Sequence, residues 1–413
     1  MNVPGDKSVS HRALMLGALA NGQSSVARLA PGRDVASTED CLRRLGVRIE
    51  ASGRGTVIHG NGLYGFSKPP ETLDAGNSGT TIRLLSGILA AQPFDSEITG
   101  DESIRRRPMR RIVEPLRAMG GRIETSAGFL APIKISGTRI RPVDYTLPVP
   151  SAQVKSCILM AALFAEGTTS VTEPALSRDH TERMFEHLGV RFRREGLRIE
   201  ICGPQVPEPG DIDVPGDISS AAFPMVAAAL IPDSELTLRD VGINPTRMGI
   251  LHVLREMGCS VSESNSKTAS REPRADLVVR SSVLRGTEIG GDMIPRIIDE
   301  IPVLAIAAAR ASGRTVVRDA AELRVKETDR IASLARNLKA MGVRIDVFDD
   351  GFSIEGPQEL RGAVVDSMND HRIAMAFAVA GLIAEGKTTI TNTECADISF
   401  PGFFDLLGEA EYE

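Results

Sequence analysis

A short phrase that recurs six times constrains the fold of this chain more than any other feature. Each copy has Leu or Phe, two variable residues, Leu or Met, and then Gly, and in most copies a β-branched stretch follows. Glycine adopts the left-handed conformation that often ends an α-helix, so each phrase predicts a helix C-terminus. The copies lie roughly seventy residues apart, which predicts six modules rather than a short-period solenoid. They occupy residues 42–46, 116–120, 185–189, 254–258, 338–342 and 404–408.

A longer repetition divides the chain into halves. The tetrapeptide Val-Pro-Gly-Asp stands at residues 3–6 and again at 214–217, and each copy leads into a serine-containing helix start. An ordinary turn used twice is the simpler alternative. The matched context favours a duplication. We therefore predict two domains of three modules each, one made of residues 6–215 and the other of residues 1–5 with 216–413.

Hydrophobic patterning predicts helices inside each domain and sheets outside. Four segments are apolar on nearly every face, which is typical of buried helices: 157–165, 223–230, 302–311 and 374–384. Strands are predicted at 168–172, 315–318 and 388–391, which are rich in Thr, Val and Ile. The polar segment 262–273 is interpreted as a solvated hairpin loop. The pattern indicates an α/β protein with buried helices and outer sheets.

Composition excludes several classes of protein. The chain has 42% hydrophobic and 25% charged residues, with no apolar run long enough to cross a bilayer and no visible secretory signal. Its five cysteines are scattered, which is typical of reduced thiols in a cytoplasmic protein. The net charge of −6 argues against a nucleic-acid partner. The six histidines lack metal-ligand spacing, so we expect no metal site.

The polar loops before the predicted helices contain most of the chemically reactive side chains. A helix N-terminus presents unpaired N–H groups and a partial positive charge, so several of them gathered in one cleft are suited to an anion. The sequence therefore predicts a small polyanionic ligand. The candidate residues in these loops are Lys7, Ser8, Arg12, Asn77, Gly79, Arg107, Ser151, Ala152, Gln153, Arg178, Asp299, Lys326, Glu327, Arg330, His371 and Arg372.

Each loop also has a plain structural interpretation. A helix start with hydroxyls and cations is often a capped helix with solvated charges. The arginine-rich run 105–111 is typical of a solvated face or a nucleic-acid patch. If 324–330 is helical, Lys326 and Arg330 share one face, and such pairs contribute ~0.5 kcal/mol or less. A lone histidine such as His371 is more often structural than catalytic.

Together, the loop motifs resemble those of the 5-enolpyruvylshikimate-3-phosphate (EPSP) synthase family, the 3-phosphoshikimate 1-carboxyvinyltransferases. The resemblance spans nearly the whole chain in the family's order, at residues 4–12, 76–80, 107–109, 151–156, 324–330 and 370–375. It implies two inside-out α/β barrel domains, each of three βαβαββ-type modules, in the enolpyruvate transferase fold. It also implies that loops from both domains converge on shikimate 3-phosphate and phosphoenolpyruvate, in the pathway to chorismate and the aromatic amino acids.

The resemblance assigns roles to the candidate residues. It implies that the first domain carries most contacts to shikimate 3-phosphate, and the second domain the acid, the base and further phosphoenolpyruvate contacts. Shikimate 3-phosphate is expected to be held by Lys7, Ser8, Arg12, Ser151, Gln153, Arg178 and Asp299. Phosphoenolpyruvate is expected among Asn77, Gly79, Arg107, Arg330 and Arg372, with Lys7, Gln153 and Lys326 near both ligands. Ala152 and His371 are expected to bind substrate as well. We expect Asp299 to act as base and Glu327 as acid, with Lys7 and Lys326 stabilising charge. No cofactor is expected, and we expect a cytoplasmic monomer.

The sequence departs from the family pattern at two places. Family members have another strand before the first motif, whereas Met1 stands three residues before Pro4, so the start or the domain crossover is expected to be incomplete. Many relatives have a lysine before the Phe-Pro of the last module, where this chain has Asp397, Ile398 and Ser399. We expect a raised KM for phosphoenolpyruvate as a result. At Gly79, the resemblance implies that glyphosate occupies the phosphoenolpyruvate space.

Two other functions remain open from the sequence. A UDP-N-acetylglucosamine enolpyruvyl transferase shares the fold and the donor, but it has Lys-Asn where Lys7-Ser8 stands here, and a reactive loop cysteine that this chain does not show. A non-catalytic repeat scaffold would explain the modules but not the acid, base and cations at the helix starts.

Overall fold

The computed structural model describes residues 1–53 and 55–410, and the chain divides into two compact units. The N-terminal unit consists of Gly5–Val214 and Thr268–Glu272. The C-terminal unit consists of Met1–Pro4, Pro215–Lys267 and Pro273–Glu413. The first residues of the chain therefore belong to the same unit as its second half.

Each unit contains three helices that are buried along almost their whole length. Their sequences are rich in Ala, Leu, Ile and Met and lack a polar face, so they are stable only where other elements surround them. They are α1 (Lys7–Leu19), α3 (Gly79–Leu89) and α6 (Ala152–Ala162) in the N-terminal unit, and α8 (Ile218–Leu230), α11 (Ile301–Arg310) and α13 (His371–Leu382) in the C-terminal unit. The four buried apolar helices predicted from the sequence are confirmed as α6, α8, α11 and α13.

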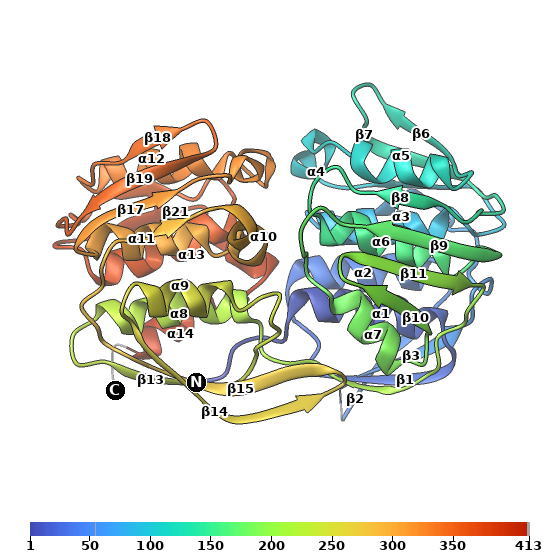
Figure 1. The fold of residues 1–413 in the computed structure, drawn as a ribbon, viewed down its shortest axis with the longest axis horizontal. Helices are drawn as coiled ribbons and strands as arrows, with labels where there is room; N and C mark the ends of the chain where they lie inside the picture. Colours follow the sequence, from blue (N-terminus) through green and yellow to red (C-terminus); the bar gives the residue numbers. More distant parts are fainter. Residues whose placement is uncertain (54, 411–413) are drawn as a thin grey trace. The chain divides into compact units, whose positions relative to one another are not determined.

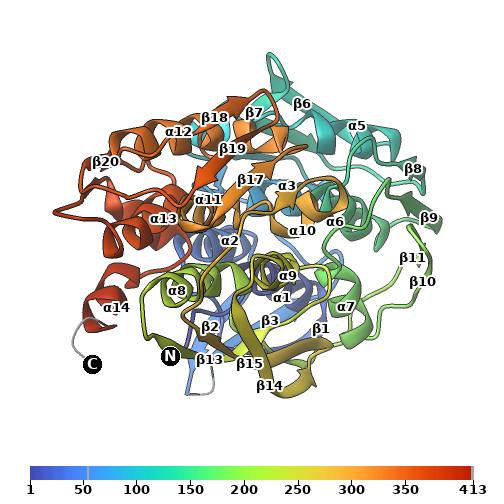
Figure 2. The same cartoon turned by 60° about the vertical axis from the view of Figure 1, so that its left-hand side comes forward.

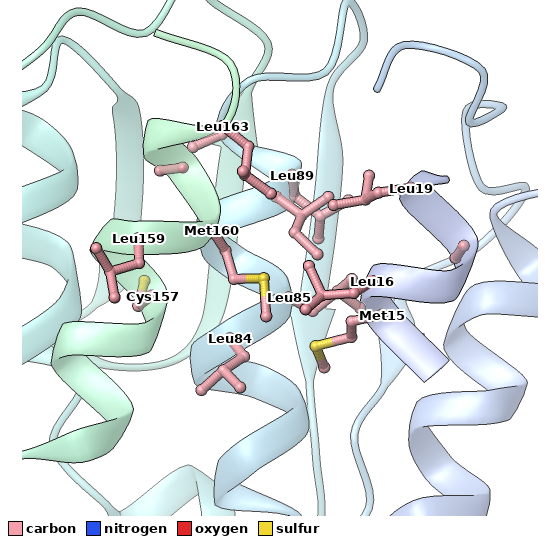
Figure 3. Close-up of a cluster of buried hydrophobic side chains, with 14 of the residues drawn as sticks. Met15, Leu16, Leu19, Leu84, Leu85, Leu89, Cys157, Leu159, Met160 and Leu163 are labelled. Atoms are coloured by element: carbon pink, nitrogen blue, oxygen red, sulfur yellow. The ribbon is translucent and has the colours of Figure 1, made fainter. Parts of the chain in front are cut away.

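The three helices of the N-terminal unit pack on one another through aliphatic and sulfur-containing side chains. Figure 3 shows Leu16 on α1, Leu85 on α3 and Met160 on α6 in one cluster. All three side chains are fully buried. Truncating one such residue to Ala typically costs about 2–5 kcal/mol, because lost transfer energy and a residual cavity add together. This packing fixes the spacing of the helix N-termini that carry the candidate site residues.

Sheets cover the buried helices. In the N-terminal unit α6 packs against β9 and β11 (Figure 1), and in the C-terminal unit α11 packs against β19 (Figure 2). The sheets of the N-terminal unit have the orders β12-β1-β3-β2, β4-β5-β7-β6 and β10-β11-β9-β8. Their strands are β1 (Asn21–Ala27), β2 (Arg48–Ser52), β3 (Gly55–Asn61), β4 (Leu73–Asp74), β5 (Ser96–Thr99), β6 (Arg122–Ser126), β7 (Leu130–Ser136), β8 (Asp144–Thr146), β9 (Gly167–Thr172), β10 (Phe192–Glu195), β11 (Arg198–Gly203) and β12 (Asp211–Asp213).

The C-terminal unit has sheets with the orders β13-β15-β14, β16-β17-β19-β18 and β20-β21. Their strands are β13 (Glu235–Gly242), β14 (Ser260–Ala269), β15 (Glu272–Arg280), β16 (Glu288–Ile289), β17 (Gly313–Val317), β18 (Asp346–Phe348), β19 (Gly351–Gly356), β20 (Val364–Asp366) and β21 (Thr389–Thr391). The three strands predicted from the sequence are confirmed as β9, β17 and β21.

Further helices complete the modules. They are α2 (Arg33–Arg44), α4 (Glu102–Arg106), α5 (Arg110–Ala118), α7 (His180–His187), α9 (Gly249–Glu256), α10 (Ile294–Ile297), α12 (Arg330–Ala340) and α14 (Phe403–Ala410), with 3₁₀ turns at Gly291–Met293, Ala321–Val325 and Thr393–Ile398. A strand, a buried helix, a strand, a second helix and a hairpin follow one another, as in β8, α6, β9, α7, β10 and β11.

The first module of each unit takes its edge segment from a distant part of the chain. In the N-terminal unit, β12 pairs in parallel with β1. In the C-terminal unit, residues 1–4 run beside β13: the Met1 ammonium donates to the Thr237 carbonyl at 2.9 Å, and the Arg239 N–H donates to the Met1 carbonyl at 3.0 Å. Residues 1–4 therefore pair with β13 of the C-terminal unit, to which they belong.

The recurrent glycine phrase is a helix-ending motif. After α2, the Gly46 N–H donates to the Arg43 carbonyl at 2.9 Å and the Val47 N–H to the Leu42 carbonyl at 3.0 Å, which is the Schellman pattern. The first residue of the phrase is thus the acceptor and the glycine takes the left-handed conformation. The φ values are +86°, +90°, +72°, +90° and +84° at Gly46, Gly120, Gly189, Gly258 and Gly342.

The sixth copy of the phrase does not behave in this way. Gly408 lies inside α14, so the prediction that it ends a helix is wrong. In the described part of this last module, β20 and β21 form a two-stranded sheet without the final hairpin that other modules contain. The helix continues through this glycine to Ala410.

One further local prediction is wrong in part. Residues 262–273 form a largely exposed hairpin, as predicted, but most of them are not loop: β14 and β15, drawn in Figures 1 and 2, continue to a tight turn that includes Ser270 and Arg271 at positive φ. Residues 324–330 do not form one helix, so the condition under which Lys326 and Arg330 would share a helix face is not met. A 3₁₀ turn ends at Val325, Lys326 is extended, and α12 begins only at Arg330, because Asp329 caps that helix.

Candidate active site

Most of the buried helices begin at a residue whose side chain caps the first turn. Ser78 and Ser151 accept from backbone N–H groups at the starts of α3 and α6. At α1 the cap is the Asp6 carboxylate, which accepts from the Val9 N–H at 2.9 Å, and not a serine hydroxyl as the sequence suggested. Asp370 caps α13 in the same way. Each cap fixes the orientation of the following residues, which are the candidate binding residues.

Arg12 connects three helices of the N-terminal unit. Its Nε donates to Thr181 Oγ1 at 2.7 Å, its Nη2 to Ser156 Oγ at 2.8 Å and its Nη1 to the Ser8 carbonyl at 2.8 Å. Burial lowers the pKa of Arg12 to about 10, although Glu182 raises it, and the nearby Arg178 adds to the lowering. This guanidinium bonds neutral oxygens in a buried place, which leaves its charge available to an anion.

Lys7, at the first position of α1, pairs with a carboxylate that sequence reasoning missed. Its Nζ lies 2.8 Å from Asp34 Oδ2, and the two side chains are 18% and 8% exposed. Asp34 belongs to the first turn of α2. The ion pair holds the lysine in one orientation while part of it stays open to solvent.

Gln153 and Arg83 link the starts of α6 and α3. Arg83 Nη1 donates to Gln153 Oε1 at 2.6 Å, and Gln153 Nε2 donates to Thr80 Oγ1 at 3.1 Å. A Cβ atom on Gly79 would lie 2.9 Å from Arg83 Nη1 and 3.2 Å from Arg107 Nη1. The glycine therefore leaves room for two guanidinium groups at this helix start.

Asn77 and Arg107 form a second contact near the same helix. Arg107 Nη2 donates to Asn77 Oδ1 at 3.3 Å and to Ser103 Oγ at 2.8 Å, and Asn77 Nδ2 donates to Asp101 Oδ2 at 2.7 Å. Arg107 is largely buried, at 7% exposed. The structure thus brings Asn77, Gly79, Arg83 and Arg107 together.

The remaining candidates of this unit lie on two loops. Ser151 and Ala152 form the cap and first residue of α6. Arg178 lies in the segment between β9 and α7, close enough to Arg12 to affect its pKa. These residues belong to the helix starts that Arg12 and Gln153 connect.

In the C-terminal unit, Arg330 is surrounded by carboxylates. Its Nε lies 2.8 Å from Asp370 Oδ2, its Nη2 lies 2.6 Å from Glu327 Oε2, and its Nη1 lies 3.5 Å from Asp299 Oδ1. Burial lowers the pKa of Arg330, but the attraction of Asp370 and Glu327 outweighs it and the pKa is raised. One buried guanidinium therefore connects the expected base, Asp299, with the expected acid, Glu327.

Lys326 completes this cluster. Its Nζ lies 4.0 Å from Asp299 Oδ1, and its side chain is 24% exposed. Burial lowers the pKa of Lys326 below the ordinary lysine value, and Asp299 opposes that lowering. Such an ammonium releases its proton more readily than a solvated one.

The last helix start carries His371 and Arg372. Both are buried, and the Arg372 guanidinium lies 6.0 Å from the centroid of the Phe223 ring. The Arg372 N–H donates to Asp370 Oδ1 at 2.9 Å. Asp370 thus caps α13 and pairs with Arg330 at once. Asp397 and Ile398 lie in the 3₁₀ turn Thr393–Ile398, and Ser399 follows it.

Sequence reasoning missed three charged residues of these clusters: Asp34, Arg83 and Asp370. Arg83 could have been found, because it follows Gly79 by one helical turn and so lies on the same face. Aspartate is common at helix starts, so Asp34 and Asp370 are ordinary residues there. Nothing in the sequence shows which cation each of them pairs with.

The described residues contain neither a cluster of three or more His, Cys, Asp or Glu that could hold a metal ion nor a helix with the length and apolar character needed to cross a bilayer.

Comparison with known proteins extends these observations over the whole chain. The family model described as EPSP synthase (3-phosphoshikimate 1-carboxyvinyltransferase) matches residues 1–407. The 3-phosphoshikimate 1-carboxyvinyltransferase of Brevibacillus brevis is 53% identical over 408 residues, covering 98% of this chain and 96% of that protein. The protein of the same name from Geobacter sulfurreducens is 52% identical over 406 residues, covering 98% and 95%.

A solved structure agrees with the sequence relatives. The EPSP synthase of Acinetobacter baumannii matches with a TM-score of 0.88 and 46% identity, covering 99% of this chain and 95% of that one. The enolpyruvate transferase fold predicted from the sequence is therefore confirmed. With its full-length family match and its conserved architecture, this chain belongs to the EPSP synthase family.

Proposed function

We propose that this protein transfers the enolpyruvyl group of phosphoenolpyruvate to the 5-hydroxyl of shikimate 3-phosphate and releases inorganic phosphate. The observation that carries the proposal is the family match over residues 1–407, which includes every candidate loop. The reaction belongs to the biosynthesis of chorismate and the aromatic amino acids.

The charges of the two substrates fit the residues of the two clusters. Each substrate has a phosphate and a carboxylate, so binding both requires several cations to offset their repulsion. Around shikimate 3-phosphate we place Lys7, Ser8, Arg12, Ser151, Ala152, Gln153, Arg178 and Asp299. Around phosphoenolpyruvate we place Asn77, Gly79, Arg107, Arg330, His371 and Arg372, with Lys7, Gln153 and Lys326 serving both.

The chemistry requires one proton acceptor and one proton donor. Asp299 takes the proton of the 5-hydroxyl while that oxygen attacks C2 of phosphoenolpyruvate, and Glu327 gives a proton to the methylene carbon. The resulting tetrahedral intermediate loses a proton from its methyl group and expels phosphate, which restores the enol ether. The 2.6 Å contact between Arg330 and Glu327 and the 3.5 Å contact between Arg330 and Asp299 support this assignment, because one cation orients both carboxylates.

Phosphate release tests the proposal directly. Purified protein mixed with both substrates should release inorganic phosphate, and mass spectrometry should detect the enolpyruvyl ether. Either substrate alone should give none. Release that requires UDP-N-acetylglucosamine instead of shikimate 3-phosphate would assign the protein to the related transferase, and no release with any acceptor would support a scaffold.

We also propose that the protein acts as a cytoplasmic monomer. Its cysteines are free thiols, four buried and one exposed at Cys202, which suits a reducing compartment. Each unit has its own hydrophobic core. Light scattering during gel filtration should give a mass near the 44.2 kDa of one chain; twice that mass would contradict the proposal.

A further inference from the structure

A fully buried lysine in the N-terminal unit pairs with two buried carboxylates. Lys155 Nζ, on α6, lies 2.6 Å from Glu173 Oε1 and 2.7 Å from Glu182 Oε1. The three side chains are 0%, 1% and 4% exposed. A buried charge is tolerated only when partners compensate it, so Lys155 requires these carboxylates. The proposed chemistry uses none of the three.

Glu173 has a second set of partners. Both of its carboxylate oxygens accept from Ser177 Oγ, at 2.8 Å and 3.0 Å, and Glu173 Oε2 also accepts from the Ser177 N–H at 3.0 Å. Glu173 is the first residue of the segment that connects β9 to α7, and Ser177 lies four residues further along it. The buried Glu173 carboxylate therefore links the first residue of this segment to Ser177, and through Lys155 it links the segment to α6.

The residue after Ser177 is Arg178. Its charge lowers the pKa of the buried Arg12, so the two guanidinium groups lie within electrostatic reach of one another. Like charges repel, so holding the backbone that carries Arg178 helps to keep the two groups near one another. Ser177 is buried, at 4% exposed, whereas Pro174 and Leu176 of the same segment are exposed. The segment is therefore anchored by the hydrogen bonds of Ser177 and not by its exposed residues.

We propose that Glu173 is a positioning residue that fixes the 173–178 segment, so that Arg178 is held beside Arg12 to receive the phosphate of shikimate 3-phosphate. The proposal rests on the proposed function. It adds that binding of one substrate depends on a carboxylate that touches neither substrate. Lys155 balances the charge of that carboxylate and ties the segment to the helix whose first turn carries Ser151 and Gln153.

The test compares two variants, each of which removes the charge of one of the two carboxylates that pair with Lys155. Glu173→Gln should raise the KM for shikimate 3-phosphate by ~10-fold, the size expected from weakened charge-assisted hydrogen bonds, while the KM for phosphoenolpyruvate stays within about twofold. Glu182→Gln is the matched control, because Glu182 contacts Lys155 from α7 and is not part of the segment. It should leave the KM for shikimate 3-phosphate within about threefold of the wild-type value.

Further variants separate positioning from folding. Glu173→Ala removes every acceptor for Ser177 and should exceed Glu173→Gln in its effect on the KM for shikimate 3-phosphate. Pro174→Gly loosens the segment at an exposed position and leaves the buried charges intact, so it tests the same idea if the Glu173 variants do not fold. It should raise the same KM by ~3-fold, because glycine increases the freedom of the unheld chain.

The outcomes decide between explanations. Equal effects of Glu173→Gln and Glu182→Gln on the KM for shikimate 3-phosphate would overturn the proposal, because the charge of Lys155 would then be responsible. Equal effects of Glu173→Gln on both KM values would overturn it too. An inactive wild-type protein would instead refute the proposed function, and calorimetric titration with shikimate 3-phosphate would still report whether Glu173→Gln weakens binding.

Discussion

The buried arginines of the two units are held in opposite ways. Arg12 donates to two hydroxyls and a carbonyl, whereas Arg330 contacts three carboxylates. Burial lowers the pKa of Arg12 to about 10, whereas at Arg330 burial is outweighed by the attraction of Asp370 and Glu327, which raises the pKa. A guanidinium among neutral oxygens retains its charge for an incoming anion. A guanidinium that is surrounded by carboxylates is already paired with them and holds them in a fixed orientation. The comparison therefore supports the proposal that Arg12 binds an anion directly and that Arg330 also orients the proposed base and acid.

The largest expected effect comes from removing Arg330. Arg330→Met leaves Asp299, Glu327 and Asp370 without their shared cation, and loss of one partner of a buried charge group typically costs about 3–5 kcal/mol. Turnover should be abolished. Arg12→Met should lower the free energy of unfolding by only about 1–3 kcal/mol, because its partners are neutral. Urea unfolding of both variants measures the difference, and equal losses would remove the distinction between the two clusters.

Glu327 should affect catalysis without a matching loss of stability. Glu327→Gln removes the proposed proton donor, and loss of a general acid typically lowers turnover by ~10²–10⁴-fold. Arg330 keeps its contacts to Asp370 and Asp299, so the free energy of unfolding should fall by only about 1 kcal/mol. Glu355→Gln, at an exposed position of β19, is the control and should keep full activity. If Glu327→Gln retained wild-type kcat, another residue would have to supply the proton.

Gly79 should matter for phosphoenolpyruvate and for glyphosate. A methyl group there lies 2.9 Å from Arg83 Nη1 and 3.2 Å from Arg107 Nη1, so at least one guanidinium must move. Gly79→Ala should raise the KM for phosphoenolpyruvate by ~10-fold, or about 1.4 kcal/mol, and weaken glyphosate inhibition by a similar factor. Gly408→Ala meets no atom within 4 Å and serves as the control. Unchanged glyphosate sensitivity in Gly79→Ala would exclude the steric explanation.

The smallest effect concerns the pH dependence of stability at Lys326. Because burial lowers its pKa in the folded state, the folded protein disfavours the charged form and is destabilised where the lysine is protonated. Lys326→Met should therefore slightly stabilise the protein at pH 7. The gain should shrink as pH rises through the folded pKa toward the ordinary value of 10.5. Urea midpoints at several pH values measure this, with the exposed Lys339→Met as a control. A loss of stability at pH 7 would contradict the expectation.

Local patterns in the sequence predicted much of the fold. The glycine phrase encodes its own hydrogen bonds, because its first residue is the acceptor of the helix-ending contact, and this succeeded up to Gly342. It did not hold at Gly408, which lies inside α14. The hairpin at 262–273 was predicted, but its strands were interpreted as loop, because their polar residues suit an exposed strand as well as a loop.

The site could be predicted only in part. Lys7 and Arg330 were identifiable from their loops, but their partners Asp34 and Asp370 depend on pairings across helices that no local pattern encodes. Helix register explains why Arg83 reaches the start of α3. It does not explain the break at Lys326, since the Asp329 cap competes with continued helix. Sequence patterns therefore miss the residues whose role depends on contacts between different elements.

The exchanged edge segments have a consequence for how the polypeptide can be divided. A gene split between residues 214 and 215 leaves residues 1–4 on the first fragment, although those residues hydrogen-bond beside β13 of the second. The second fragment would expose an unsatisfied strand edge, a template for self-association. Co-expression of both pieces would supply residues 1–4 from the first fragment. The second fragment should therefore be more soluble when it is co-expressed with the first than when it is expressed alone.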